Sequence, residues 1–65
     1  MASDEKVRVT IMAELGGPTK KTKAQLRSAV KKAHSDVSDG QFDKCLNGLR
    51  GGGRIITDGN KYKRK

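Results

Sequence analysis

The side chains of this sequence that could carry chemistry are mainly lysines and arginines, and they are clustered. Residues 18–34 hold six basic residues and no acidic one, and residues 54–65 hold five basic residues and one aspartate. The blocks carry net charges of +6 and +4, and the rest of the chain carries −2, which gives the formal charge of +8. Clustered positive charge favours a polyanion as partner, because each phosphate neutralised by Lys or Arg releases condensed counterions. The blocks therefore predict nucleic-acid binding, with a solvated basic face or an acidic protein partner as alternatives.

Groups able to perform catalysis or to hold a metal are few. The single cysteine, Cys45, and the single histidine, His34, fall short of the four ligands of a zinc site. Gly51-Gly52-Gly53 lacks the spacing and the Lys-Ser/Thr pair of a phosphate-binding loop. A chain of 65 residues also has little room for a walled pocket beside a core. We therefore expect neither an enzyme nor a cofactor.

Global composition sets further expectations. No apolar run approaches the roughly 20 residues that span a bilayer, and no secretory leader follows Met1. An intracellular location without a membrane partner is expected, in the cytoplasm or nucleoid or in a eukaryotic nucleus. Leu, Ile, Val and Phe supply only 12 of 65 residues, a share typical of disordered chains. Whether the chain folds therefore depends on where these residues lie.

Two capped helices are predicted in the middle of the chain. Thr22-Lys23-Ala24-Gln25 has the form of a capping box, and so has Ser38-Asp39-Gly40-Gln41. Apolar side chains follow each box at the spacing of one helix face: Leu26, Ala29, Val30 and Ala33 in the first, and Phe42, Cys45, Leu46 and Leu49 in the second. The first helix is expected over residues 23–34. The second is expected to end at Gly51, where a left-handed cap forms easily.

A β-hairpin is predicted after the second helix. Arg54-Ile55-Ile56-Thr57 and Asn60-Lys61-Tyr62-Lys63 have strand composition, and Asp58-Gly59 between them is a strong hairpin signal. A two-residue turn at 58–59 would pair Ile55 with Tyr62 on one face of the hairpin.

The N-terminal segment fits two patterns. A start at Ser3-Asp4-Glu5 with Val7, Ile11 and Leu15 on one face indicates a helix over residues 4–15, whereas alternation from Val7 to Leu15 indicates a strand. Of the 12 strong apolar residues, all but Val9 and Val37 fall on the stripes, hairpin or first segment proposed above. The local pattern leaves both forms of the first segment open.

The order of these elements resembles the winged helix-turn-helix DNA-binding domain. The resemblance is carried by the run Asp36-Val37-Ser38, Phe42, Leu46, Leu49, Gly53-Arg54-Ile55 and Gly59-Asn60-Lys61-Tyr62-Lys63. Its spacing is similar to the winged module of ferric uptake regulators and, more distantly, to the globular domain of linker histones. It implies one mainly α domain over residues 1–65, with three helices and a two-stranded antiparallel hairpin. Residues 1–3 and 64–65 are expected to fray.

The resemblance also implies a role for each basic element in binding double-stranded DNA, as a monomer or weak dimer, in transcription regulation or DNA organisation. Residues 38–50 would be the recognition helix, with Gln41, Lys44 and Asn47 facing the bases. The phosphate-binding and wing residues would be Lys20, Lys21, Lys23, Arg27, Lys31, Lys32, Arg54, Lys61, Lys63 and Arg64. Asp39 and Asp43 are expected to repel phosphate. The alternatives are an RNA- or ribosome-associated protein and a winged-helix protein-interaction module.

Overall fold

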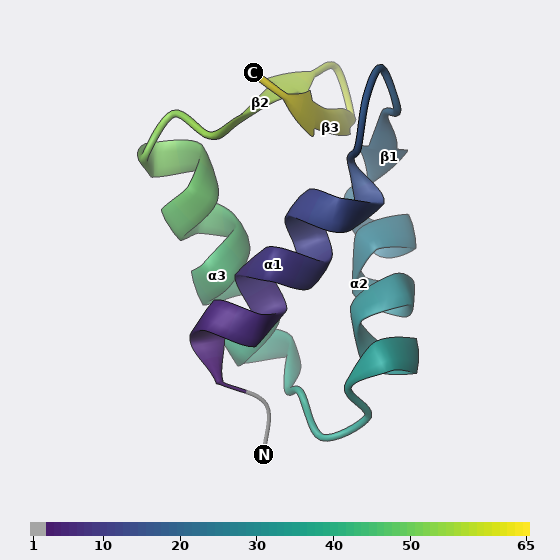
Figure 1. The fold of residues 1–65 in the computed structure, drawn as a ribbon, viewed down its shortest axis with the longest axis vertical. Helices are drawn as coiled ribbons and strands as arrows, with labels where there is room; N and C mark the ends of the chain where they lie inside the picture. Colours follow the sequence, from purple (N-terminus) through teal and green to yellow (C-terminus); the bar gives the residue numbers. More distant parts are fainter. Residues whose placement is uncertain (1–2) are drawn as a thin grey trace.

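In the computed structural model, which describes residues 3–65, three helices pack side by side and a small sheet lies across one end of them (Figure 1). The elements, in chain order, are α1 (Asp4–Glu14), β1 (Lys21–Thr22), α2 (Lys23–Ala33), α3 (Asp39–Gly51), β2 (Ile55–Asp58) and β3 (Lys61–Arg64). The sheet lies at the C-terminal end of α3 and the N-terminal end of α2. Residues 1 and 2, which were expected to fray, lie outside the described part of the chain.

The ambiguous N-terminal segment is a helix. The Ser3 side chain caps α1 by accepting a hydrogen bond from the Lys6 backbone N–H at 3.2 Å. Val7, Ile11 and Leu15 are completely buried, whereas the side chain of Val9 is 62% exposed. A strand would have placed Val9 on the same face as the other three residues. The helical period instead puts only the buried three against the rest of the core.

Both predicted helix starts are capped, α2 by the full capping box and α3 by the Ser38 side chain. The Thr22 hydroxyl accepts from the Gln25 backbone N–H at 3.2 Å, and the Gln25 side chain accepts from the Thr22 backbone N–H at 2.9 Å. The Ser38 side chain likewise accepts from the Gln41 backbone N–H at 3.1 Å. The apolar stripe predicted for α2 was wrong at one residue, because Ala33 is exposed rather than buried. It is the last residue of α2, where the chain turns away from the core.

The end of α3 also differs from the sequence expectation. Gly51 is the last helical residue, but the left-handed position is Gly53, with φ of +76°. The backbone N–H of Gly53 donates to the Arg50 carbonyl, and that of Arg54 donates to the Leu49 carbonyl at 3.0 Å. This pair of bonds is the Schellman motif, which satisfies the last helical carbonyls and turns the chain into β2.

The sheet has three strands rather than the two that were expected, in the order β1-β3-β2, with antiparallel pairing throughout. Strand β1 was missed because it has two residues and overlaps the cap of α2. The cap residue Thr22 already has an extended backbone, with φ of −73° and ψ of 163°. That backbone pairs Thr22 with Lys61 while its side chain caps the helix.

The hairpin register was also predicted wrongly. Asp58 pairs with Lys61, so the two loop residues are Gly59 and Asn60 instead of 58 and 59. Gly59 has φ of +66°, which suits a type II′ hairpin turn with glycine in its first position. Ile55 therefore lies opposite Arg64 instead of Tyr62. Arg64, expected in a frayed end, belongs to β3.

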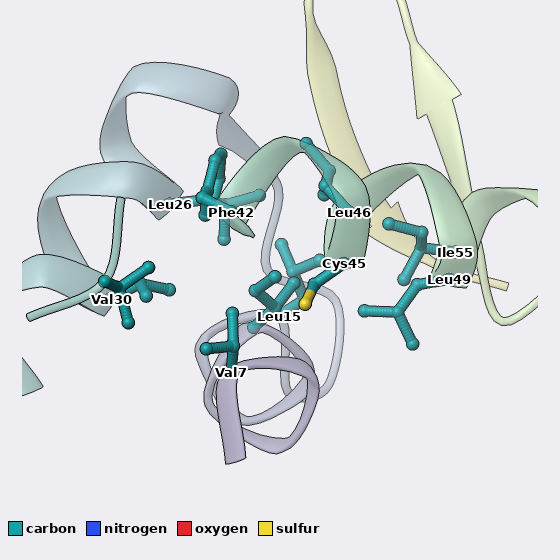
Figure 2. Close-up of a cluster of buried hydrophobic side chains, with 11 residues drawn as sticks. Val7, Leu15, Leu26, Val30, Phe42, Cys45, Leu46, Leu49 and Ile55 are labelled. Carbon is teal, nitrogen blue, oxygen red and sulfur yellow. The ribbon is translucent and has the colours of Figure 1, made fainter. Parts of the chain in front are cut away.

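The core collects apolar side chains from all three helices and from β2 (Figure 2). Its largest completely buried members include Phe42, Leu26 and Ile55, and Cys45 is 2% exposed. Val37, which the helix stripes left out, is 3% exposed and belongs to the same cluster. Met12 and Tyr62 pack against its edge. Only about a third of the chain is apolar, but this share is enough to form a core because the buried residues form one contiguous cluster.

Candidate nucleic-acid interface

The exposed side of α3 carries two of the three base-contacting residues predicted from the sequence. Gly40, Lys44, Asn47 and Gly51 recur at helical spacing opposite the buried stripe, and all four are exposed. We call them the outer row of α3. The Lys44 side chain is 77% exposed. The outer row therefore offers an amino group and an amide, and its other two members are glycines.

The third predicted residue, Gln41, is turned toward α1. It is half-buried, and its side-chain Nε2 donates to Asp4 Oδ1 at 3.1 Å. Lys44 Nζ lies 3.4 Å from Asp4 Oδ2. The hydrogen bond from Gln41 and the charge of Lys44 lower the pKa of the Asp4 carboxyl below its usual range. Gln41 thus joins α3 to the start of α1 instead of facing outward with Lys44 and Asn47.

The two acidic residues of α3 are paired with lysines of α2. Lys31 Nζ lies 2.7 Å from Asp39 Oδ1, and Lys23 Nζ lies 2.9 Å from Asp43 Oδ1. The Lys31 ammonium group lowers the pKa of Asp39, with a smaller contribution from Arg27. The repulsion of phosphate expected from these aspartates is therefore offset by cations of the neighbouring helix.

Two other lysines of the first basic block connect β1 and its preceding loop to other elements. Lys20 Nζ lies 2.5 Å from Asp58 Oδ2 at the hairpin, and Lys21 Nζ lies 2.8 Å from Glu14 Oε1 at the end of α1. Lys20 is the main cause of the lowered pKa of Asp58. Exposed ion pairs of this kind contribute little to stability, so these lysines can exchange a carboxylate for a phosphate at small cost.

The remaining predicted phosphate-binding residues divide into exposed cations and one anchor. Arg27 and Lys32 on α2 are exposed and, within residues 3–65, have no ion-pair partner. Arg54 and Lys61 are exposed and Lys63 is half-buried. Arg64 is different, because its Nε and Nη2 donate to the Met12 carbonyl at 3.2 and 3.0 Å. Arg64 therefore ties β3 to α1.

The sequence did not single out the helical glycines as site residues. A Cβ built on Gly40, Gly48 or Gly51 would meet nothing within 4 Å, and none of the three has a positive φ. Glycine inside a helix costs about 0.8–1.0 kcal/mol relative to alanine. Neither the conformation nor the packing of α3 requires glycine at these positions.

Other classes of site receive no support from residues 3–65. These residues contain no group of three or more His, Cys, Asp or Glu that could hold a metal ion. No helix in the same part of the chain is long and apolar enough to cross a membrane. The chain matches no protein-family model, no curated protein and no solved structure.

Proposed function

We propose that this protein binds duplex DNA as a winged helix-turn-helix module. In this proposal α3 enters the major groove, and the β2–β3 hairpin acts as the wing against the phosphate backbone. The element order supports it, because three helices are followed by a basic hairpin at the C-terminal end of α3 (Figure 1). The major groove is about 12 Å wide and admits one α-helix.

The observation that carries the proposal is the outer row of α3. It contains Lys44 and Asn47 and no acidic side chain, while Asp39 and Asp43 point to the lysines of α2. Lysine can donate to guanine O6 and N7, and asparagine can pair with the N6 and N7 edge of adenine. Gly40 and Gly51 at the two ends of the row would allow the helix backbone to come close to the DNA.

The basic residues around α3 would supply most of the affinity. Five of them lie on α2, on β3 or just before β2 and make none of the ion pairs described above: Arg27, Lys32, Arg54, Lys61 and Lys63. The paired lysines of the first block would exchange aspartate or glutamate for phosphate on binding. Contacts to phosphate fix position and orientation, whereas Lys44 and Asn47 would add sequence preference.

A salt-titrated binding series tests the proposal. Fluorescence anisotropy with a labelled random duplex should give a steep fall in affinity with salt, by about a thousandfold between 50 and 200 mM if roughly six phosphates are contacted. The double variant Lys44→Ala/Asn47→Ala should bind more weakly. Lys6→Ala, which removes a positive charge from the exposed side of α1, is the matched control. The proposal fails if no binding occurs at low salt, if the control loses as much affinity, or if a structured RNA competes better than the duplex.

A further inference from the structure

A groove of about 710 Å³ runs between α1 and α3 and ends at the sheet. Its apolar lining is Val9, Met12 and Ala13 on α1 and Leu49 on α3. Three arginines line it as well: Arg8 from α1, Arg54 from the segment before β2, and Arg64 from β3. We call this site the arginine groove. It lies on the side of α3 that faces α1, beside the outer row.

The apolar lining of the arginine groove is incompletely covered. The Val9 side chain is 62% exposed, although it is a large apolar residue in the middle of a helix. Met12 packs against the core only at its edge. Val9 lies on the opposite side of α1 from Val7 and Ile11, so the core leaves its side chain uncovered. Val9 and Met12 thus form a small apolar surface edged by charged groups, on which one apolar side chain of a partner can pack.

The charges around the groove indicate the chemistry of the partner. Arg8 and Arg54 are exposed and, within residues 3–65, neither has an ion-pair partner. Arg64 is held in place by its two bonds to the Met12 carbonyl. Against these three guanidinium groups, Glu5 is the single carboxylate of the lining. Guanidinium groups bind carboxylates with paired, geometrically specific hydrogen bonds.

We propose that the arginine groove binds a short acidic segment of another protein. An apolar side chain of that segment would pack on Val9 and Met12, and its carboxylates would pair with the arginines. This is the helix-in-groove mode of peptide recognition, with charge complementarity added at the rim. A second copy of this chain suits the groove poorly, because it would bring the same arginines and a charge of +8 against each other. The site goes beyond the proposed DNA binding.

A direct binding experiment with a defined probe tests this site. The probe is a labelled helical peptide of about 12 residues, with Leu at positions i, i+3 and i+4 and Glu at the flanking positions. It should bind the wild-type protein. A peptide with every Glu replaced by Gln should bind about tenfold more weakly or worse, as expected when one or more charge-assisted hydrogen bonds are lost.

Two substitutions at one position provide the matched variants. Val9→Glu places a carboxylate in the groove and should weaken peptide binding by about tenfold or more. Val9→Ile keeps the apolar contact and should bind as the wild type does. Because Val9 is exposed, neither change touches the core. Val9→Ile should bind duplex DNA with unchanged affinity, and Val9→Glu should bind it as Lys6→Ala does, because both of these changes lower the net charge by one. These comparisons separate failure of this site from failure of the proposed function.

Three results would overturn the site. The first is equal binding of the Glu and Gln peptides, or equal binding to both Val9 variants. The second is competition between peptide and duplex together with loss of peptide binding in Lys44→Ala, which would put the peptide on the outer row of α3. The third is self-association of the wild-type protein, measured by sedimentation, that Val9→Glu abolishes. That result would assign the groove to a second copy of the chain.

Discussion

Replacing the helical glycines of α3 by alanine, one at a time, distinguishes an effect on stability from an effect on DNA binding. Gly40 belongs to the outer row, with Lys44 and Asn47 one and two turns further along the helix. Gly48 lies on the side of α3 that faces α1. A Cβ at either position meets nothing within 4 Å, and neither residue has a positive φ. Gly40→Ala and Gly48→Ala should therefore both fold.

The expected magnitudes follow from helix propensity and from the proposed contact. Gly48 is inside the helix, so alanine there should raise the free energy of unfolding by about 0.8–1.0 kcal/mol. For a domain of this size, a gain of 1 kcal/mol raises Tm by roughly 4–8 °C. Gly40 is the second residue of α3, so its gain should be smaller, within the same limit. If the helix backbone approaches DNA at Gly40, a methyl group there should lose about 1 kcal/mol of binding, roughly fivefold in Kd.

Thermal unfolding followed by circular dichroism and anisotropy titration with one duplex measure the two quantities. The expected result is that both variants unfold at higher temperature, while only Gly40→Ala binds DNA more weakly. Equal DNA affinity in Gly40→Ala and the wild type would refute the close approach of the outer row. A lower Tm in Gly48→Ala would refute the open surroundings of that position.

Three further predictions concern the fold. Phe42→Ala removes the largest buried side chain and should lower the free energy of unfolding by about 3–5 kcal/mol. That is most of the stability of a domain this small, so the cooperative thermal transition should be lost. Gly53→Ala forces a Cβ into the left-handed conformation at the end of α3 and should lower the free energy of unfolding by roughly 1–2 kcal/mol in urea titrations, in contrast to the gain from Gly48→Ala. Folding lowers the pKa of the Asp58 and Asp39 carboxyls from an ordinary value of 3.8. The ionised carboxylates therefore stabilise the folded protein above pH 3.8, and this stabilisation is lost as the pH falls through the folded pKa of each carboxyl. Because exposed ion pairs stabilise a fold only slightly, the free energy of unfolding should decrease by a small amount as pH falls below about 4. Lys20→Gln should return the pKa of Asp58 toward its ordinary value in an NMR titration, whereas an unchanged pKa would contradict the ion pair.

The helices were predictable because their signals are local. Thr22 and Gln25 lie three residues apart, so the capping box can be recognised without knowing the fold. The stripe from Phe42 to Leu49 likewise requires only the helical period. The first segment could not be decided locally, since Val7, Ile11 and Leu15 fit both periods. The burial of these three and the exposure of Val9 follow from packing against α2 and α3.

The candidate site was predictable in composition but not in arrangement. The sequence located the basic blocks and placed Lys44 and Asn47 on the exposed side of the second capped helix. It could not show that Gln41 turns toward α1, or that Arg64 anchors the hairpin to Met12. These contacts join residues 37 and 52 positions apart.

The sequence by itself determined the helix starts, the types of core residues and the two concentrations of positive charge, because each depends on residue identity and on neighbours within about two turns. Only the tertiary structure decided which charges are paired. Lys20 meets Asp58 across 38 positions, and Lys31 meets Asp39 between neighbouring helices. It also decided the third strand, the hairpin register and the arginine groove. Each of these arises where segments distant in the chain pack together, and no local pattern records which distant surface a side chain will face.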